Sequence, residues 1–393
     1  MKKIIMIFLT FSLTLFGMSY ENFKKQTLKN SKILKSQTLQ LEATQYENNI
    51  LLRTSNPTLS LDASRFDEKA RNSGYDYGYS ATATQEIRTG SYMTGLKSKA
   101  QASKLLSEAF ATQGHAGYLK TLEMLYTQYV YQSKMLNLLK EEYGLSKRVT
   151  SMVKDRYISG SENRVSYLQA KTQTTTLKTQ MYTNRQELST LYYQLMAIAG
   201  FSKKVTLDKK FIYSVSSKVK HSSKLSPKEK VLKAQKNIYV SDLNMNKSSF
   251  QNYELYGGIE KEPDQSILKF GINIPISLHN DRSEERMLAK LKMQQNLLDQ
   301  EQLSLTTRSQ KNMIKVSIRE LSSQYYELNS LQKEQKELTA LLKEGYKISK
   351  GSLFQLMTAK NKLIQTRKAL LQTQKIINDQ KIELRFLQGD YNE

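Results

Sequence analysis

The side chains that most often do covalent or metal chemistry are scarce in this chain. It has no cysteine, which excludes disulfides, thiolate metal sites, a cysteine nucleophile and a lipid-modified N-terminal cysteine. Its histidines, His115, His221 and His279, lie far apart in sequence and form no helical zinc-binding pair. These residues therefore predict no metal site and no cysteine-based catalysis.

Basic charge is the next feature that could serve a function. The 393 residues carry a formal net charge of +24, which by itself suggests a nucleic-acid partner. However, Lys2 and Lys3 precede an apolar run over residues 4–16, and Gly17 and Ser19 are small. This pattern predicts a secretory signal peptide over 1–19, with cleavage after Ser19. An exported chain makes a nucleic-acid role improbable, and the lysines are spread singly among Gln, Ser and Thr, as on a solvated helical surface.

Most of the chain after residue 19 has the periodicity of long helices. Apolar residues keep a 3/4 spacing in several stretches, and a spacing of seven joins Leu356, Leu363, Leu370, Ile377 and Leu384. This is coiled-coil periodicity, in which a narrow apolar seam packs against another helix. Proline is absent from 58–226 and from 276 to the end, so these helices can be long.

Two interruptions of the helical pattern predict strand hairpins, over 57–87 and 250–278. In both stretches, apolar residues alternate with polar ones, as in Leu59 and Leu61 beside Ser60 and Asp62, or Ile272 and Ile274 beside Asn273. Alternation with aromatic residues over about ten positions is typical of membrane β-barrel strands. From the alternation alone, a soluble sheet with one exposed face is the alternative.

The two halves of the chain also match each other. Tyr157 and Tyr346, Ala170 and Ala359, and Gly200 and Gly389 are all 189 residues apart, as are Lys171 and Lys360, and Ala100 and Ala289. We therefore expect a duplicated chain whose parts are a signal peptide (1–19), a first repeat (20–200, with helical hairpin 95–199), a linker (201–225), a second repeat (226–389, with helical hairpin 281–388) and a tail (390–393). A capping box at Ser226 and Glu229 should open the second repeat.

Four strands per chain cannot close a barrel, because about eight are needed before the interior fills with side chains. Open sheet edges are not tolerated in lipid. If these strands cross a membrane, several chains must share one barrel, and the long helices would continue it as a tube. The pattern does not give the number of chains.

Several motifs, taken in order, resemble those of the TolC-like outer-membrane efflux protein family. They are Asn56-Pro57-Thr58-Leu59-Ser60-Leu61, Arg156-Tyr157-Ile158-Ser159-Gly160, Leu168-Gln169-Ala170, Gly271-Ile272-Asn273-Ile274-Pro275-Ile276, Tyr346-Lys347-Ile348-Ser349 and Leu356-Met357-Thr358-Ala359. The likeness covers essentially the whole chain after residue 19.

This resemblance implies a mainly α fold with a membrane β-barrel part. Three chains would share a twelve-stranded barrel in the outer membrane, in contact with its lipid, above a periplasmic α-barrel of coiled-coil hairpins. The implied partners are a periplasmic membrane-fusion adaptor and an inner-membrane pump of the RND or ABC type. The implied function is export of small molecules, drugs or metal ions, or of proteins in type I secretion. No enzyme activity, catalytic residue or cofactor is expected.

The resemblance also indicates two groups of functional residues at the helical tips. The adaptor-docking tips would be Tyr157, Gly160 and Ser161 in the first half and Ser349, Lys350 and Gly351 in the second. The pore constriction would be Tyr346, Gln355, Thr358, Ser166 and Gly351. The family's acidic and basic gate residues fall at Ser166 and Gly351 here, and its acidic ring falls at Gln355 and Thr358. We therefore expect an entrance held by packing and neutral hydrogen bonds, with weak block by cations.

Three other kinds of protein compete with this interpretation. A structural or adhesive surface coiled-coil protein would explain the heptads and the leader, but not the duplicated hairpins. A periplasmic adaptor has one central helical hairpin, whereas this sequence repeats two. A secreted nucleic-acid-binding protein would explain the charge alone.

Overall fold

The computed structural model describes residues 17–67, 75–219, 222, 224–247, 250–276, 281–348 and 351–391. Helices and strands follow one another in an order that repeats: α1 (Tyr20–Asn30), α2 (Lys32–Leu52), β1 (Thr58–Asp67), β2 (Tyr75–Arg88), α3 (Gly90–Ile158), α4 (Arg164–Ala199), α5 (Pro227–Met245), β3 (Asn252–Lys261), β4 (Ser266–Asn273), α6 (Ser283–Lys347) and α7 (Leu353–Leu387). Residues 1–16 of the predicted signal peptide lie outside the described part of the chain.

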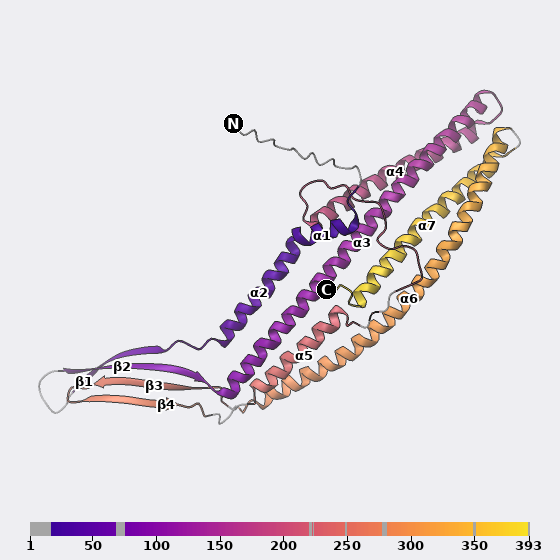
Figure 1. The fold of residues 1–393 in the computed structure, drawn as a ribbon. Coiled ribbons are helices and arrows are strands. Elements are labelled where there is room, and N and C mark those ends of the chain that lie inside the picture. Colours follow the sequence, from indigo (N-terminus) through magenta and orange to yellow (C-terminus); the bar gives the residue numbers. More distant parts are fainter. Residues whose placement is uncertain are drawn as a thin grey trace, which may run out of the picture.

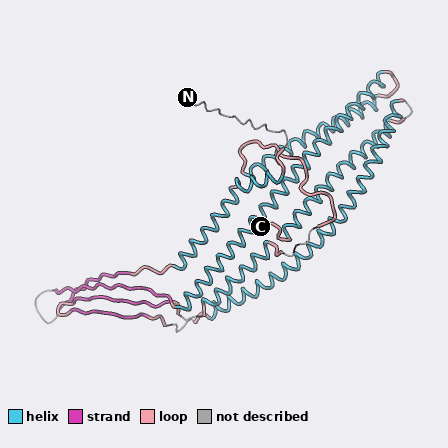
Figure 2. The backbone as a smooth tube through the Cα atoms, in the orientation of Figure 1, coloured by secondary structure: helices cyan, strands magenta, loops and turns pink. Residues whose placement is uncertain are grey.

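The molecule is elongated, with the sheet at one end and the tips of two helical hairpins at the other (Figure 1). The long helices α3 and α6 run from the sheet to the tips, and α4 and α7 return beside them for part of that length (Figure 2). Helices α2 and α5 fill the remaining length beside α3 and α6. Within the described ranges, no helix is both long and apolar enough to cross a membrane.

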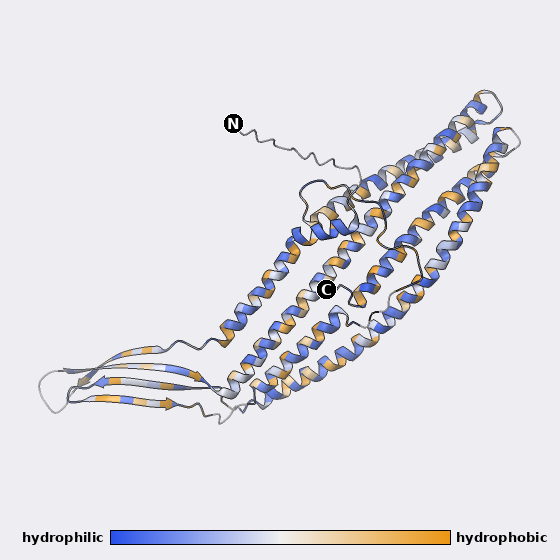
Figure 3. Cartoon of the chain, in the orientation of Figure 1, coloured by the Kyte–Doolittle hydropathy of each residue, from blue (hydrophilic) through white to orange (hydrophobic). Residues whose placement is uncertain are grey.

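The strands form one antiparallel sheet in the order β1-β2-β3-β4. The first hairpin pairs Leu61 with Ala81, and β2 then pairs with β3 of the second repeat, where Ala81 faces Ile259. Each strand contains both hydrophobic and hydrophilic residues (Figure 3). By the register, one face carries large apolar side chains that the chain itself leaves exposed, and the other face is mostly polar. The alternation in the sequence therefore separates two faces of one sheet, shared by both repeats.

Positions related by the offset of 189 have matching environments. Gly200 and Gly389 end α4 and α7 with φ of 72° and 71°, which is the left-handed conformation that glycine adopts without strain. Ala100 and Ala289 are both buried, as are Ala170 and Ala359. A small residue at these positions lets a neighbouring helix approach closely. Two pairs are exceptions: Lys171 and Tyr157 are exposed, whereas their counterparts Lys360 and Tyr346 are buried.

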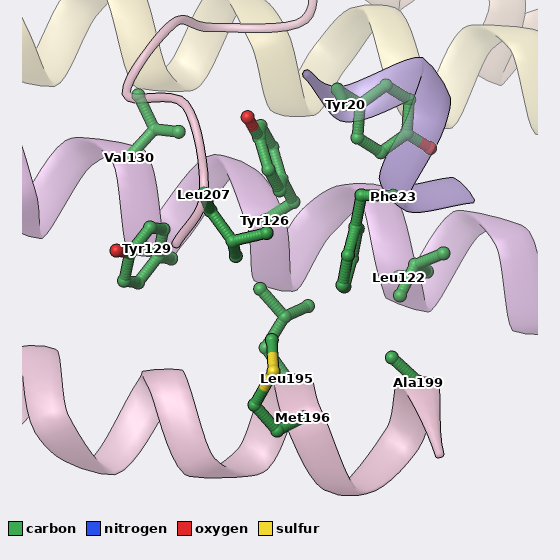
Figure 4. Close-up of a cluster of buried hydrophobic side chains, with 10 residues drawn as sticks. All are labelled: Tyr20, Phe23, Leu122, Tyr126, Tyr129, Val130, Leu195, Met196, Ala199 and Leu207. Atoms are coloured by element: carbon green, nitrogen blue, oxygen red, sulfur yellow. The ribbon is translucent and has the colours of Figure 1, made fainter. Parts of the chain in front are cut away.

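The largest apolar cluster lies near the middle of the molecule, where α1, α3, α4 and the segment after α4 meet (Figure 4). Phe23, Leu122, Tyr126 and Leu195 have no exposed surface there. Leu207, from the stretch that we expected to be a linker, is also buried in this cluster. The linker therefore packs as part of the core. Its apolar residues, which are interspersed among lysines and serines, could have indicated this burial, but the overall polar composition of the segment obscured them.

A buried carboxylate next to this cluster joins the two ends of the chain. Glu123 of α3 is fully buried, and its Oε1 accepts hydrogen bonds from the Tyr20 hydroxyl at 3.1 Å and from Arg385 Nη1 at 3.4 Å. Its Oε2 accepts from the hydroxyls of Tyr213, at 3.0 Å, and Tyr391. We call these five residues the Glu123 hub. Burial and the charge of Glu123 raise the pKa of Tyr20 and Tyr391 above the usual range, so both hydroxyls stay donors.

The seam between α3 and α4 shows how the sequence handles breaks in its apolar repeat. Gln132 and Asn184 occupy apolar positions of the 3/4 pattern, and in the structure the Asn184 amide donates to Gln132 Oε1 at 2.5 Å. Gln132 in turn donates to Glu187 at 2.6 Å. Two polar residues in one seam therefore partner each other across it. The capping box at Ser226 and Glu229 is confirmed, since both of its hydrogen bonds form.

Candidate functional site: the helical tips

The first tip is a tight reversal after α3. Gly160 adopts φ of 75°, and the backbone N–H groups of Gly160 and Ser161 donate to the carbonyls of Tyr157 and Arg156. This pair of bonds is a Schellman motif, which stops a helix at a left-handed residue. No atom lies within 4 Å of where a Cβ on Gly160 would be. The ring of Tyr157 stacks on that of Tyr167 at 5.9 Å, which joins the two helices below the turn.

The second tip differs from the first in the surroundings of its glycine. Helix α6 ends at Lys347 and α7 begins at Leu353, and the expected docking residues Ser349 and Lys350 lie outside the described residues. A Cβ on Gly351 would come within 2.8 Å of the Tyr346 backbone nitrogen. Glycine is therefore required at this position because the backbone of Gly351 lies against the end of α6.

Tyr346 lies between the two hairpins, with only 1% of its surface exposed. It packs in a cluster with Val149 and Val153 of α3 and with Leu353 and Leu356 of α7. Tyr346, which lies on α6, therefore contacts α3 of the first helical hairpin on one side and α7 of its own hairpin on the other. The tyrosine thus joins the two hairpins.

Two charged residues of the first hairpin hold Tyr346 in place. Its hydroxyl donates to Glu162 Oε2 at 2.9 Å. Arg156 Nη1 donates to the Tyr346 carbonyl at 2.8 Å, and the guanidinium lies over the tyrosine ring, 4.5 Å from its centroid. A cation over an aromatic face is attracted by its quadrupole. We call Tyr346, Glu162 and Arg156 the tip lock.

The protonation states of the tip lock are compatible with these hydrogen bonds at neutral pH. Partial burial opposes ionisation of Glu162, but hydrogen bonds from Tyr346, Ser166 and the Asn163 backbone, together with the charge of Arg156, lower its pKa. Burial, followed by the hydrogen bond to Glu162, raises the pKa of Tyr346 to about 12. Glu162 is therefore an anionic acceptor and Tyr346 a neutral donor, a charge-assisted pair.

Within one chain, the partners of Tyr346 are charged, whereas the sequence predicted only packing and neutral hydrogen bonds around it. For the assembled entrance, that expectation stays a prediction. Ser166, at the family's acidic position, forms a hydrogen bond with Glu162 and not with the tyrosine. Gly351 contributes only the close approach of its backbone to that of Tyr346. The carboxylate comes from four residues earlier, in the loop between α3 and α4. Sequence reasoning missed Glu162 and Arg156 because it compared fixed positions, whereas a loop can present an acid to the same tyrosine from a shifted position.

Gln355 and Thr358 lie on another face of the structure. Both are exposed and three residues apart on α7, next to the exposed Phe354. Among the described residues, neither side chain forms a hydrogen bond or an ion pair with a residue of the tip lock. The exposed Ile158 and Ser161 likewise project from the first tip.

Below the tips, a polar seam joins the two hairpins. Arg367 of α7 pairs with Glu142 and Glu141 of α3, each at 2.6 Å. Side-chain amides continue the seam, with Gln173 donating to Asn361 at 2.9 Å. Lys360 is buried in the same region, and burial lowers its pKa to about 8. Any separation of the hairpins must break these contacts together with the tip lock.

Comparison with known proteins agrees with this geometry. A model of the outer membrane efflux protein family matches residues 24–201. The fold resembles the outer membrane protein VceC from Vibrio cholerae (TM-score 0.77, 12% identity, covering 94% of this chain and 95% of that chain). It also resembles the Campylobacter jejuni CmeC outer membrane channel (TM-score 0.77, 15% identity, 94% and 86%) and the open state of the Neisseria gonorrhoeae MtrE outer membrane channel (TM-score 0.76, 15% identity, 93% and 88%). The resemblance to TolC-like outer-membrane efflux proteins is confirmed.

Across almost its whole length, this chain has the TolC-like fold of long helical hairpins below a four-stranded sheet segment. The family model covers the first repeat, and the solved structures extend the likeness to the second. No curated protein matches the sequence.

Proposed function

We propose that the chain is a subunit of a homotrimeric outer-membrane channel whose helical tips form a closable periplasmic entrance. The observation that carries this proposal is the open sheet. Its order leaves β1 and β4 as edges of the described sheet, and one face exposes Leu59, Leu268 and Phe270, each more than 60% accessible. Such a face and such edges need lipid and neighbouring strands.

Closure between copies is geometrically simple. Neighbouring strands in the sheet all run antiparallel, so β1 and β4 point in opposite directions. When the β4 of one chain meets the β1 of the next around a symmetry axis, the new pair is antiparallel too. The count of three chains, and hence twelve strands, comes from the family resemblance, and twelve strands leave a lumen wider than side chains fill.

The tip lock is the closing element in this proposal. It joins the first hairpin to the second at the far end from the sheet, and the constriction would form where three copies bring their tips together. Tyr346, Ser166 and Gly351 belong to this closed entrance, whereas the exposed Gln355 and Thr358 would line the pore just inside it. Tyr157, Gly160, Ser161, Ser349, Lys350 and Gly351 are the proposed contacts for a periplasmic adaptor, which would connect the channel to an inner-membrane pump of the RND or ABC type.

Conductance of the purified protein in a planar bilayer tests both parts. We expect wild-type protein to insert and to conduct little, and Glu162→Gln to increase the open fraction severalfold, because a charge-assisted hydrogen bond contributes about 1.5–3 kcal/mol when buried and less when half exposed. Glu344→Gln is the matched control, since Glu344 lies near the second tip, close to the end of α6, but is exposed and paired with Lys347. No conductance in any variant would refute a channel. Equal effects of both variants would refute the lock.

The trimer is tested independently by native mass spectrometry of the detergent-extracted outer-membrane fraction. We expect a three-chain species that heating dissociates. A soluble periplasmic monomer would contradict the proposal and favour the adaptor or adhesive interpretations.

The export signal is a further part of the proposal. Met18 pairs with Leu207 in an isolated bridge, and the Ser19 hydroxyl accepts from Asn22 N–H as the N-cap of α1. Cleavage after Ser19 would remove both contacts and leave Tyr20 of the Glu123 hub as the first residue. N-terminal sequencing of the outer-membrane protein should give Tyr20. A start before Met18 would move the cleavage site.

A further inference from the structure

One cation is buried between the two helical hairpins without a hydrogen bond. Lys360 of α7 has only 4% of its surface exposed, and its Nζ is enclosed and has no hydrogen-bond partner among the described residues. No other lysine in the described ranges is buried. A buried ammonium group normally has a partner, because a charge removed from water without one is costly. Lys360 therefore destabilises the arrangement in which it is buried.

This lysine lies in the seam where the hairpins meet. The next residue along α7, Asn361, accepts a hydrogen bond from Gln173 of α4 at 2.9 Å. Two turns further along, Arg367 pairs with Glu142 of α3 at 2.6 Å. Lys360 thus lies between the tip lock and this ion pair along α7. Separation of the hairpins would expose its Nζ to water.

The charged groups around Lys360 do not compensate for its burial. From α3, Glu142 attracts its charge and Arg148 repels it, and Glu142 already binds Arg367. Burial is the strongest influence, and it lowers the pKa of Lys360 to about 8. The other charged side chains at this level are exposed or half-exposed: Lys147 of α3, Lys171 of α4, Lys336, Glu337, Lys343 and Glu344 of α6, and Lys362 of α7. The site therefore favours a neutral side chain.

We propose that Lys360 weakens the contact between the hairpins and so opposes the tip lock, which makes the entrance open more readily at neutral than at alkaline pH. This inference rests on the proposed channel function, because the entrance exists only in the assembled channel. With the hairpins together, the ammonium group is enclosed, and when α7 moves away from α3, water solvates it. The closed state is therefore held by the tip lock and the Arg367 pair against the cost of one buried charge.

The expected pH dependence has a definite sign. With the hairpins together, Lys360 loses its proton near pH 8, whereas a solvated lysine keeps it until about pH 10.5. Between these values, raising the pH removes the proton from the closed form first, so the closed form gains stability relative to the open form. Below pH 8 the lysine is protonated in both forms, and the preference for the open form stays at its maximum.

The open fraction of the bilayer-inserted protein at pH 7.5 and pH 9.5 tests the proposal. We use the Glu162→Gln background, in which openings should be frequent, and expect the open-to-closed ratio to fall about tenfold between these pH values. Adding Lys360→Met should lower the ratio at pH 7.5 at least about tenfold and remove most of this fall. Lys171→Met is the matched control, because Lys171 occupies the equivalent position of the first repeat but is exposed, and it should change neither value.

Acetylation of the assembled protein by acetic anhydride, followed by mass spectrometry of its peptides, gives a second readout that needs no conductance. The reagent modifies amines that water reaches. We therefore expect Lys360 to react at least about tenfold more slowly than the exposed Lys171 at pH 7.5. Glu162→Gln should speed the reaction of Lys360 and leave that of Lys171 unchanged.

The failure of this inference is distinguishable from failure of the channel function. Conducting channels in which Lys360→Met and Lys171→Met have the same open fraction and the same pH dependence would overturn the inference and leave the channel intact. Equal acetylation rates of the two lysines would also overturn it. Absence of conductance from every variant would instead refute the channel function on which it rests.

Discussion

Replacing Glu123 by glutamine should destabilise the protein far more than the loss of one charge elsewhere on the same helix. The Glu123 carboxylate is fully buried and accepts three tyrosine hydroxyls and the Arg385 guanidinium. Glutamine keeps the shape but offers one carbonyl oxygen and an NH2 group. If the amide nitrogen takes the place of Oε2, the hydroxyls of Tyr213 and Tyr391, which both donate to Oε2, would face an N–H donor and lose their acceptor.

The expected cost follows from what the substitution leaves behind. One buried donor without an acceptor costs about 1–3 kcal/mol, and breaking a buried ion pair from one side costs about 3–5 kcal/mol. Arg385 is only partly buried and keeps its contact with Tyr213, so we expect the lower part of this range, about 3 kcal/mol in the free energy of unfolding.

Urea unfolding of the purified protein, followed by far-ultraviolet circular dichroism, measures the difference. Glu141→Gln is the matched control, because Glu141 lies on α3 and pairs with Arg367, but its side chain is 59% exposed. Exposed pairs contribute less than about 1 kcal/mol. Equal destabilisation by the two substitutions would refute the idea that the Glu123 hub ties the chain ends together.

Two further predictions concern buried positions that have exposed or unconstrained counterparts. Burial lowers the pKa of Lys360 to about 8 in the folded chain, so the unfolded chain binds the extra proton between pH 8 and 10.5 and stability should rise with pH across that window. Lys360→Met should raise stability at pH 7 and abolish this rise, whereas Lys171→Met, at the exposed counterpart, should do neither in urea titrations at several pH values. Gly200→Ala should cost more than Gly160→Ala, because both have positive φ but a Cβ on Gly200 would lie 2.8 Å from the Asn30 carbonyl oxygen. Equal shifts in the melting temperatures of the two alanine variants would contradict that reasoning.

Much of the architecture could be predicted from local patterns. The alternating stretches are the strands of one sheet, and the residues with a spacing of seven lie on α7. The repeat offset identified Gly200 and Gly389 as equivalent helix ends. These features depend on residues that are close in sequence or on a repeated pattern, so they can be recognised without knowledge of the fold.

The charged network at the tips could not be predicted in the same way. Tyr346 was identified from its motif, but its partners Glu162 and Arg156 lie on the other hairpin, 184 and 190 residues away. The burial of Leu207 in a segment rich in lysine and serine was missed for the same reason. In each case the partner is chosen by how two distant helices pack.

By itself, the sequence determined the periodicities, the duplication and the absence of cysteine chemistry, because each is a property of residue type and spacing along the chain. Only the tertiary structure decided which side chains meet: that Glu162 accepts from Tyr346, that Glu123 joins Tyr20 to Tyr391, and that the acids of three strands share one face. The physical reason is that burial and hydrogen-bond geometry depend on distances between residues far apart in sequence. A net charge of +24 describes the whole chain, whereas the register alone places an acidic surface within it.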